Sequence, residues 1–159
     1  MASRKKMVQR TPDLSNEFDA IKLRNWMANS KKLGRTDVFQ AALRQLCRAE
    51  GVDIDDPLER DFATTIRALE EALTDESGKK RRLSRTRQKL ARDGVHRTVS
   101  DLATQEPPGD GFAKLVEFEM ADLSAEALVV RYQDQFDATV VDAAVRRLAA
   151  SGVVLPDAG

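Results

Sequence analysis

Residues 56–73 read DPLERDFATTIRALEEAL, and this stretch decides the fold class. Its apolar side chains recur at steps of three and four residues, while its acidic side chains fall elsewhere on the helical wheel. The apolar positions are Leu58, Phe62, Ile66 or Thr65, Leu69 and Leu73. Asp56 suits the N-cap, Pro57 suits the first helical position, and Glu59 follows the cap by three residues, as in a capping box. The stretch therefore predicts an amphipathic helix.

The same helical period extends over most of the chain. Apolar residues recur at helical spacing in residues 38–46 and again in residues 140–148. No segment alternates apolar and polar residues between hairpin turns, and only 5% of the residues are aromatic. We therefore predict an all-α fold, a compact bundle of about six to seven short helices with a central basic helix-turn-helix-like unit.

Three glycines followed by valine indicate where helices end. Gly51, Gly94 and Gly152 each stand after a polar or small residue and before a valine. Glycine adopts the left-handed conformation that follows a helix without a Cβ penalty, and the next apolar residue can pack on the last turn. We expect all three to be left-handed helix stops.

The length of 159 residues favours one domain that buries about two-thirds of its unfolded surface. We expect a single helical domain over residues 13–155, with lobes at 13–77 and 79–155 as an option. A flexible basic tail at residues 1–12 and a short tail at 156–159 would flank it.

Composition excludes several classes of protein. With 42% hydrophobic and 33% charged residues, the chain resembles neither a disordered nor a membrane protein, and no apolar run approaches the roughly 18 residues of a spanning helix. No apolar signal-peptide region follows the basic residues 1–10. Cys47 is the single cysteine, so an intramolecular disulfide and a cysteine-based metal site are excluded. We expect a cytoplasmic protein of bacterial origin that binds no membrane.

The most unusual feature is a basic segment. Nine of the nineteen residues from Lys79 to Arg97 are lysine or arginine, and one, Asp93, is acidic. Such a block is a common electrostatic footprint for nucleic acid, and the planar guanidinium of arginine matches phosphate oxygens. The residues expected to bind nucleic acid are Lys79, Lys80, Arg81, Arg82, Arg85, Arg87, Lys89, Arg92, His96 and Arg97, with Arg4, Lys5, Lys6 and Arg10 as an auxiliary basic tail.

Acidic stretches on both sides leave two other interpretations open. Residues 53–76 hold nine acidic and two basic residues, and residues 98–159 hold eleven and four. The basic segment is therefore matched to a nucleic acid, paired with acidic surfaces of this chain or of another subunit, or simply solvated. Exposure of Arg82, Arg85, Lys89 and Arg92 together would favour a binding face. Contact with Glu70, Glu71 or Glu117 would favour internal pairing.

Residues 90–103 resemble the turn and second helix of a bacterial repressor-type helix-turn-helix, with Gly94 in the turn and residues 98–100 in the second helix. The register departs from that pattern, because Lys89 and Asp93 fall at positions that the motif buries. We expect a generic unit instead, in which helices beginning near Arg82 and Arg97 are joined by a glycine turn.

The second of these helices has a short exposed face. We expect Val99, Leu102 and Ala103 to be buried and four polar residues to face outward, namely Arg97, Thr98, Ser100 and Asp101. So short a face that carries an acid favours contacts to phosphate over readout of bases. The predicted function is phosphate-weighted, low-specificity binding, with DNA preferred over RNA.

Enzymatic function is not expected, and no catalytic residue, metal site or cofactor is predicted. His96 is the single histidine, so one chain cannot assemble a site of several histidines. Cys47 lies next to Leu46 on an apolar helix face, where a free cysteine behaves as a small buried side chain.

The alternative function is a helical protein-interaction module or a subunit of an oligomer, formed through acidic or apolar surfaces. The apolar side chains of the first helix, including Phe18, Ile21 and Trp26, spread around more of its surface than one core contact requires. Trp26 is the candidate interface residue. The competing explanation is that this helix is central and buried on two sides.

Overall fold

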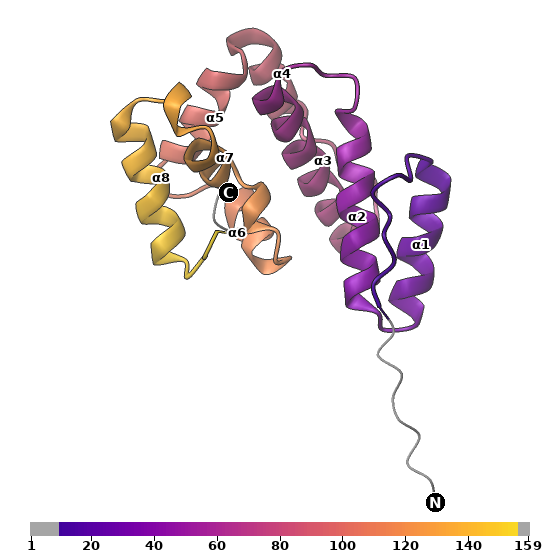
Figure 1. The fold of residues 1–159 in the computed structure, drawn as a ribbon. Coiled ribbons are helices and arrows are strands. Elements are labelled where there is room, and N and C mark those ends of the chain that lie inside the picture. Colours follow the sequence, from indigo (N-terminus) through magenta and orange to yellow (C-terminus); the bar gives the residue numbers. More distant parts are fainter. Residues whose placement is uncertain (1–9, 156–159) are drawn as a thin grey trace, which may run out of the picture. The chain divides into compact units, whose positions relative to one another are not determined.

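A computed structural model describes residues 10–155, and this part of the chain contains eight α-helices, two short 3₁₀ helices and no strand (Figure 1). The α-helices are α1 (Ala20–Lys32), α2 (Thr36–Glu50), α3 (Pro57–Ser77), α4 (Ser84–Asp93), α5 (Val95–Thr104), α6 (Asp110–Glu117), α7 (Ala125–Arg131) and α8 (Ala138–Ala150). The 3₁₀ helices are η1 (Ala121–Leu123) and η2 (Gln133–Gln135). The predicted all-α class is confirmed.

The chain divides into two compact units, of which the first ends at Leu46 and the second begins at Cys47. Ser77 and Gly78, the expected junction between lobes, both lie inside the second unit. The expected C-terminal tail lies outside the described residues. Each unit has a core of its own.

The core of the first unit joins α1 to the part of α2 that ends at Leu46. Leu14, Leu23, Ala42 and Leu46 are buried together, and Met27 and Ala41 pack against them. The buried side chain of Gln45 donates hydrogen bonds to the carbonyl oxygens of Ser15, at 3.2 Å, and Glu17, at 3.0 Å. These bonds attach the segment before α1 to α2.

Helix α3 begins as the sequence predicts. Asp56 is the N-cap, its carboxylate accepts from the backbone N–H of Glu59 at 2.9 Å, and Pro57 takes the first helical position. Leu58, Phe62 and Ile66 are buried, whereas Glu59 is exposed and Asp61 is partly exposed. The apolar face of α3 thus supplies one wall of the second unit's core.

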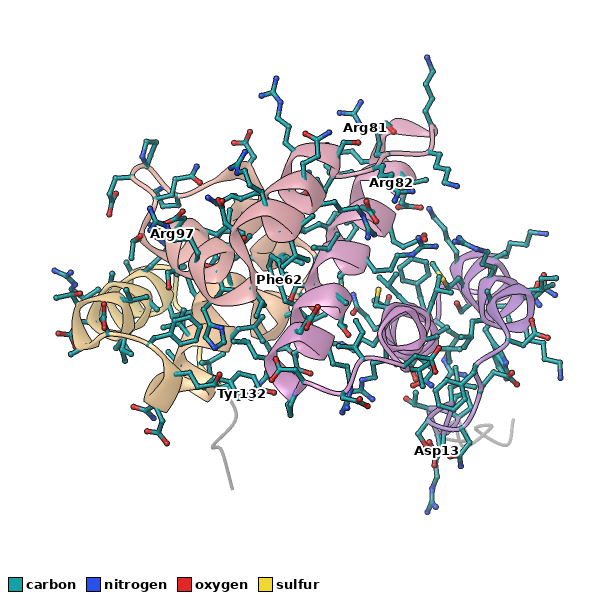
Figure 2. The ribbon with its side chains drawn as sticks, turned by 90° about the horizontal axis from the view of Figure 1, so that it is seen from above. Asp13, Phe62, Arg81, Arg82, Arg97 and Tyr132 are labelled. Carbon is teal, nitrogen blue, oxygen red and sulfur yellow. The ribbon has the colours of Figure 1, made fainter. Side chains whose placement is uncertain are left out.

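Helix α5 lies at the centre of the second unit and contacts α3, α4, α7 and α8. The buried core comprises Leu58, Phe62, Ile66, Val99, Ala103, Ala125, Leu128, Val129 and Ala144. Figure 2 shows Phe62 in this interior, surrounded by helices. Leu83, just before α4, and Leu90 on α4 pack against the same core.

A buried ion pair connects the last helix to this core. Arg147 on α8 lies 3.0 Å from Glu126 on α7, and both side chains are less than one-tenth exposed. The guanidinium also donates to the carbonyl oxygens of Leu102, at 3.2 Å, and Gln105. Burial raises the pKa of Glu126, and the hydrogen bonds it accepts, including that from Arg147, offset only part of this shift. The pair attaches α8 to α7 and to the end of α5.

The three predicted glycine stops differ. Gly152 is left-handed with a φ of 70°, and the N–H groups of Gly152 and Val153 bond to the carbonyls of Ala149 and Leu148 in a Schellman motif. Gly94 has a φ of 85° but an extended ψ of 168°, so a single residue joins α4 to α5. The prediction was wrong for Gly51, whose φ is not positive. There, a Cβ would lie 3.1 Å from the carbonyl oxygen of Arg60, so close packing accounts for the glycine.

Candidate functional site

The basic segment folds into a loop, helix α4, Gly94 and the first residues of α5. Helix α4 begins at Ser84 instead of Arg82, and α5 begins at Val95 instead of Arg97. Gly78 ends α3 in the left-handed conformation, with a φ of 72°, and starts the loop. The chain therefore leaves α3 and enters α4 within a few residues.

Hydrogen bonds that the loop donates to side chains of α3 hold this loop in place. The backbone N–H of Arg81 donates to the hydroxyl of Thr74 at 2.9 Å. The backbone N–H of Leu83 donates to the carboxylate of Glu70 at 2.8 Å. Two residues of α3 thus position the backbone on which Arg81 and Arg82 lie.

Glu70 also binds a cation of the basic segment. The guanidinium of Arg87 donates to both carboxylate oxygens of Glu70, with Nε at 3.0 Å from Oε2. The Glu70 side chain is only 5% exposed. Burial alone would raise the pKa of Glu70, but the hydrogen bonds from Arg87 and Leu83 outweigh it and hold the pKa below its ordinary value. Arg87, expected to bind nucleic acid, is instead paired inside the protein.

Three further cations lie beside carboxylates of α4 and α5. Lys89 is 2.7 Å from Asp101 and 3.0 Å from Asp93. Arg92 pairs with Asp93 at 2.9 Å, and Arg97 pairs with Asp101 at 3.2 Å. The hydrogen bonds from Lys89 and then Arg97 hold the pKa of Asp101 below its ordinary value. The sequence contained a signal for two of these pairs, because Lys89 and Asp93, like Arg97 and Asp101, are four residues apart.

The remaining cations form what we name the basic cluster: Lys79, Lys80, Arg81, Arg82 and Arg85. All five are exposed, and their side chains make no ion pair with any residue in the range 10–155. Figure 2 shows Arg81 and Arg82 projecting outward from the loop between α3 and α4. Of the four residues proposed to form one binding face, Arg82 and Arg85 are unpaired, whereas Lys89 and Arg92 are paired.

His96 lies at the start of α5 and is exposed. Its Nε2 atom is 2.7 Å from the side-chain oxygen of Gln135, and its ring centroid is 5.8 Å from that of Phe136. These contacts attach the start of α5 to the segment before α8.

The outward face of α5 is shorter than predicted. Val99 and Ala103 are buried as expected, but Thr98 is also fully buried and was wrongly placed on the surface. The helix begins two residues earlier than predicted, so Thr98 lies within its first turn. With α3, α4, α7 and α8 packed around it, α5 offers little surface for a DNA groove.

Of the auxiliary basic tail, Arg10 lies within the described residues. Arg10 is exposed, whereas Arg4, Lys5 and Lys6 lie outside the described residues. The tail's role in binding stays a prediction.

Helix α1 carries exposed apolar side chains. Trp26 is 40% exposed, Ile21 is 73% exposed, and Leu33, just after the helix, is 76% exposed. The explanation that this helix is buried on two sides is therefore wrong, because Leu23 and Ser30 are its only buried residues.

Two absences concern residues 10–155, the part of the chain that the structure describes. No three histidine, cysteine or acidic side chains gather there as a metal site would require. None of its helices combines the length and apolar character needed to cross a bilayer. Cys47 is buried, as predicted.

Comparison with known proteins identifies no relative: no family model, curated protein or solved structure matches this chain.

Proposed function

We propose that this chain is a non-enzymatic nucleic-acid-binding protein that contacts phosphates, preferably of DNA, through the basic cluster. One observation carries the proposal. Five cations lie exposed without an ion pair in the described range, while four others in the same segment have carboxylate partners. Acidic residues of the second unit pair with four cations of the basic segment. They leave the five cations of the basic cluster without an ion pair in the described range.

The basic cluster suits phosphate for a physical reason. Five like charges within seven residues repel one another, and a polyanion relieves this repulsion while releasing its own counterions. Three of the five are arginines, whose guanidinium groups form two parallel hydrogen bonds with phosphate oxygens.

The start of α4 adds to this preference. No side chain caps this end of the helix, and its first turn contains no acidic residue. The partial positive charge of a helix N-terminus therefore adds to the charge of Arg82 and Arg85 instead of being offset. An external anion near Ser84 would be stabilised by both.

Binding through this cluster would be weighted towards phosphate. The cations lie on a loop and on the first turn of a short helix, and the neighbouring α5 is largely covered. Contacts to phosphate position a protein on a duplex without reading its sequence. We therefore expect similar affinities for duplexes of unrelated sequence.

Salt dependence tests the proposal directly. A fluorescent random-sequence duplex is titrated with the protein at 50 and 200 mM salt, beside an RNA duplex of the same length. With about five phosphates neutralised, the logarithm of the binding constant should fall with a slope near −4.5 against the logarithm of salt concentration. Binding independent of salt, or no binding at 50 mM salt, would reject the proposal. Tighter binding of RNA would reject only the preference for DNA.

Exposed apolar side chains on α1 favour a second candidate function, a protein-interaction module or oligomer subunit. Trp26 and Ile21 are large apolar side chains that a partner would bury, and tryptophan is frequent at interface centres. Sedimentation at two salt concentrations, with Trp26 emission recorded in parallel, tests self-association. A monomeric mass at every protein concentration would exclude the oligomer.

A further inference from the structure

A pocket of about 220 Å³ lies within the second unit, where α3, α4, α5, α6 and α7 meet. Its walls are mainly apolar, and the larger side chains are Phe62, Leu69, Leu83, Leu102, Phe112 and Leu115. Dry apolar cavities of about 150 Å³ are known to hold a benzene molecule. The volume therefore suits a molecule of one ring with a short side chain.

The charged groups at this pocket are acidic. Asp110 and Glu126 belong to its lining, and no lysine, arginine or histidine does. The charge of Glu126 is already matched by Arg147, at 3.0 Å. Asp110, the first residue of α6, is exposed. It thus borders an apolar pocket and has no ion pair in the described range.

The hydroxyl groups of the walls are largely committed to the protein. Thr65 Oγ1 donates to the carbonyl oxygen of Leu123 at 2.5 Å, and Ser124 Oγ donates to that of Ala121 at 2.6 Å. Ser124 also caps α7, because its Oγ accepts from the N–H of Ala127 at 3.1 Å. These bonds preform the wall, which lowers the entropy cost of binding.

We propose that this pocket binds a small, ring-bearing amine, with the ring among the apolar side chains and the ammonium group beside Asp110. A compact apolar pocket with a few placed polar groups is the usual form of a small-molecule site. The carboxylate of Asp110, which has no ion pair in the described range, favours a cation and disfavours a carboxylate ligand of the same size. The site stands independently of the proposed nucleic-acid binding, although Leu83 and Thr86 in its wall flank Arg85 of the basic cluster.

The test compares two probes of similar shape and opposite charge, 2-phenylethylamine and 3-phenylpropionate. Each is titrated into the full chain, and methyl resonances are recorded by NMR. The amine should shift the methyl groups of Leu69, Leu83 and Leu115 and bind about fivefold or more tighter than the acid. In Asp110→Asn this preference should fall below about twofold, while the fold is retained.

A second pair of variants tests the location. Thr86→Phe places a ring into the pocket from α4 and should remove the shifts, whereas Thr139→Phe, at an exposed position of α8, should leave them unchanged. Circular dichroism is recorded to check that both variants are helical. If Thr86→Phe loses its helical signal, Leu69→Trp is used in its place. Absence of shifts with the amine, shifts centred on other methyl groups, or equal binding of both probes would overturn the proposal.

Discussion

The guanidinium of Arg87 on α4 donates hydrogen bonds to both carboxylate oxygens of Glu70 on α3, with Nε at 3.0 Å from Oε2. Arg85, two residues earlier, has no such partner within the described part of the chain. Residues two apart on a helix point in nearly opposite directions, so one arginine faces the protein and the other faces solvent. Helix geometry thus divides one basic segment into structural and available cations.

Removing the structural cation should destabilise the protein. Arg87→Ala leaves the buried carboxylate of Glu70 with the N–H of Leu83 as its remaining donor from the basic segment. We expect the free energy of unfolding in urea to fall by about 2 kcal/mol, as for hydrogen bonds to charged groups. Arg85→Ala is the matched control, and its effect should stay within about 0.5 kcal/mol. Equal effects of the two variants would contradict the assignment.

The same pair predicts a dependence on pH. Hydrogen bonds hold the pKa of Glu70 below its ordinary value of 4.5, so the ionised group stabilises the fold above that pH. This contribution is lost as the pH falls through the lowered pKa. The difference in unfolding free energy between the wild type and Arg87→Ala should therefore shrink between pH 6 and pH 3. A constant difference would show that Glu70 is not its source.

Cations of the basic cluster and cations with carboxylate partners should differ in their effect on the salt dependence of DNA binding. Arg82→Gln/Arg85→Gln removes two unpaired charges, whereas Lys89→Gln/Arg92→Gln removes two charges that have carboxylate partners. Both pairs change the net charge equally, so long-range attraction weakens similarly. Only the first should reduce the salt slope, by about 0.9 for each lost phosphate contact. The slope is measured by fluorescence anisotropy, and equal reductions would remove the distinction.

Two glycines should show the cost of backbone conformation alone. Gly78 and Gly94 both have positive φ, and a Cβ added at either would meet no atom within 4 Å. Gly94 combines its φ with a ψ of 168°, a region almost restricted to glycine, whereas Gly78 is left-handed. We expect Gly94→Ala to cost about 2 to 3 kcal/mol and Gly78→Ala about 1. Thermal unfolding of both variants measures this, and the reverse order would contradict the backbone explanation.

Local signals predicted much of the helical fold. The N-cap Asp56 and the first helical residue Pro57 act through residues next to them in sequence. The start of α3 could therefore be predicted from the sequence alone. The burial of Thr98 depends on the packing around α5, whose neighbours α3, α7 and α8 are distant in sequence. Gly51 likewise could not be explained from local sequence. A glycine is needed there because the carbonyl oxygen of Arg60 lies close by, and not because the backbone is left-handed.

The candidate site could be predicted only in part. The density of charge located the segment, and the four-residue spacing of Lys89 and Asp93 indicated one ion pair. The ion pair between Arg87 and Glu70 joins residues 17 apart in sequence, so it depends on the position of α4 beside α3. The pocket beside Asp110 gave no sequence signal, because its walls come from five helices.

The two hydrogen bonds that the loop backbone donates to α3 have a consequence for recognition. Thr74 holds the backbone at Arg81, and Glu70 holds it at Leu83, so this stretch is ordered before any ligand arrives. Ordering one residue costs about 1 to 2 kcal/mol, and here that cost falls on folding instead of on binding. The backbone that carries Arg81 and Arg82 is consequently fixed in the free protein, and under the proposed function this would favour polyanions whose phosphates lie within reach of it without bending.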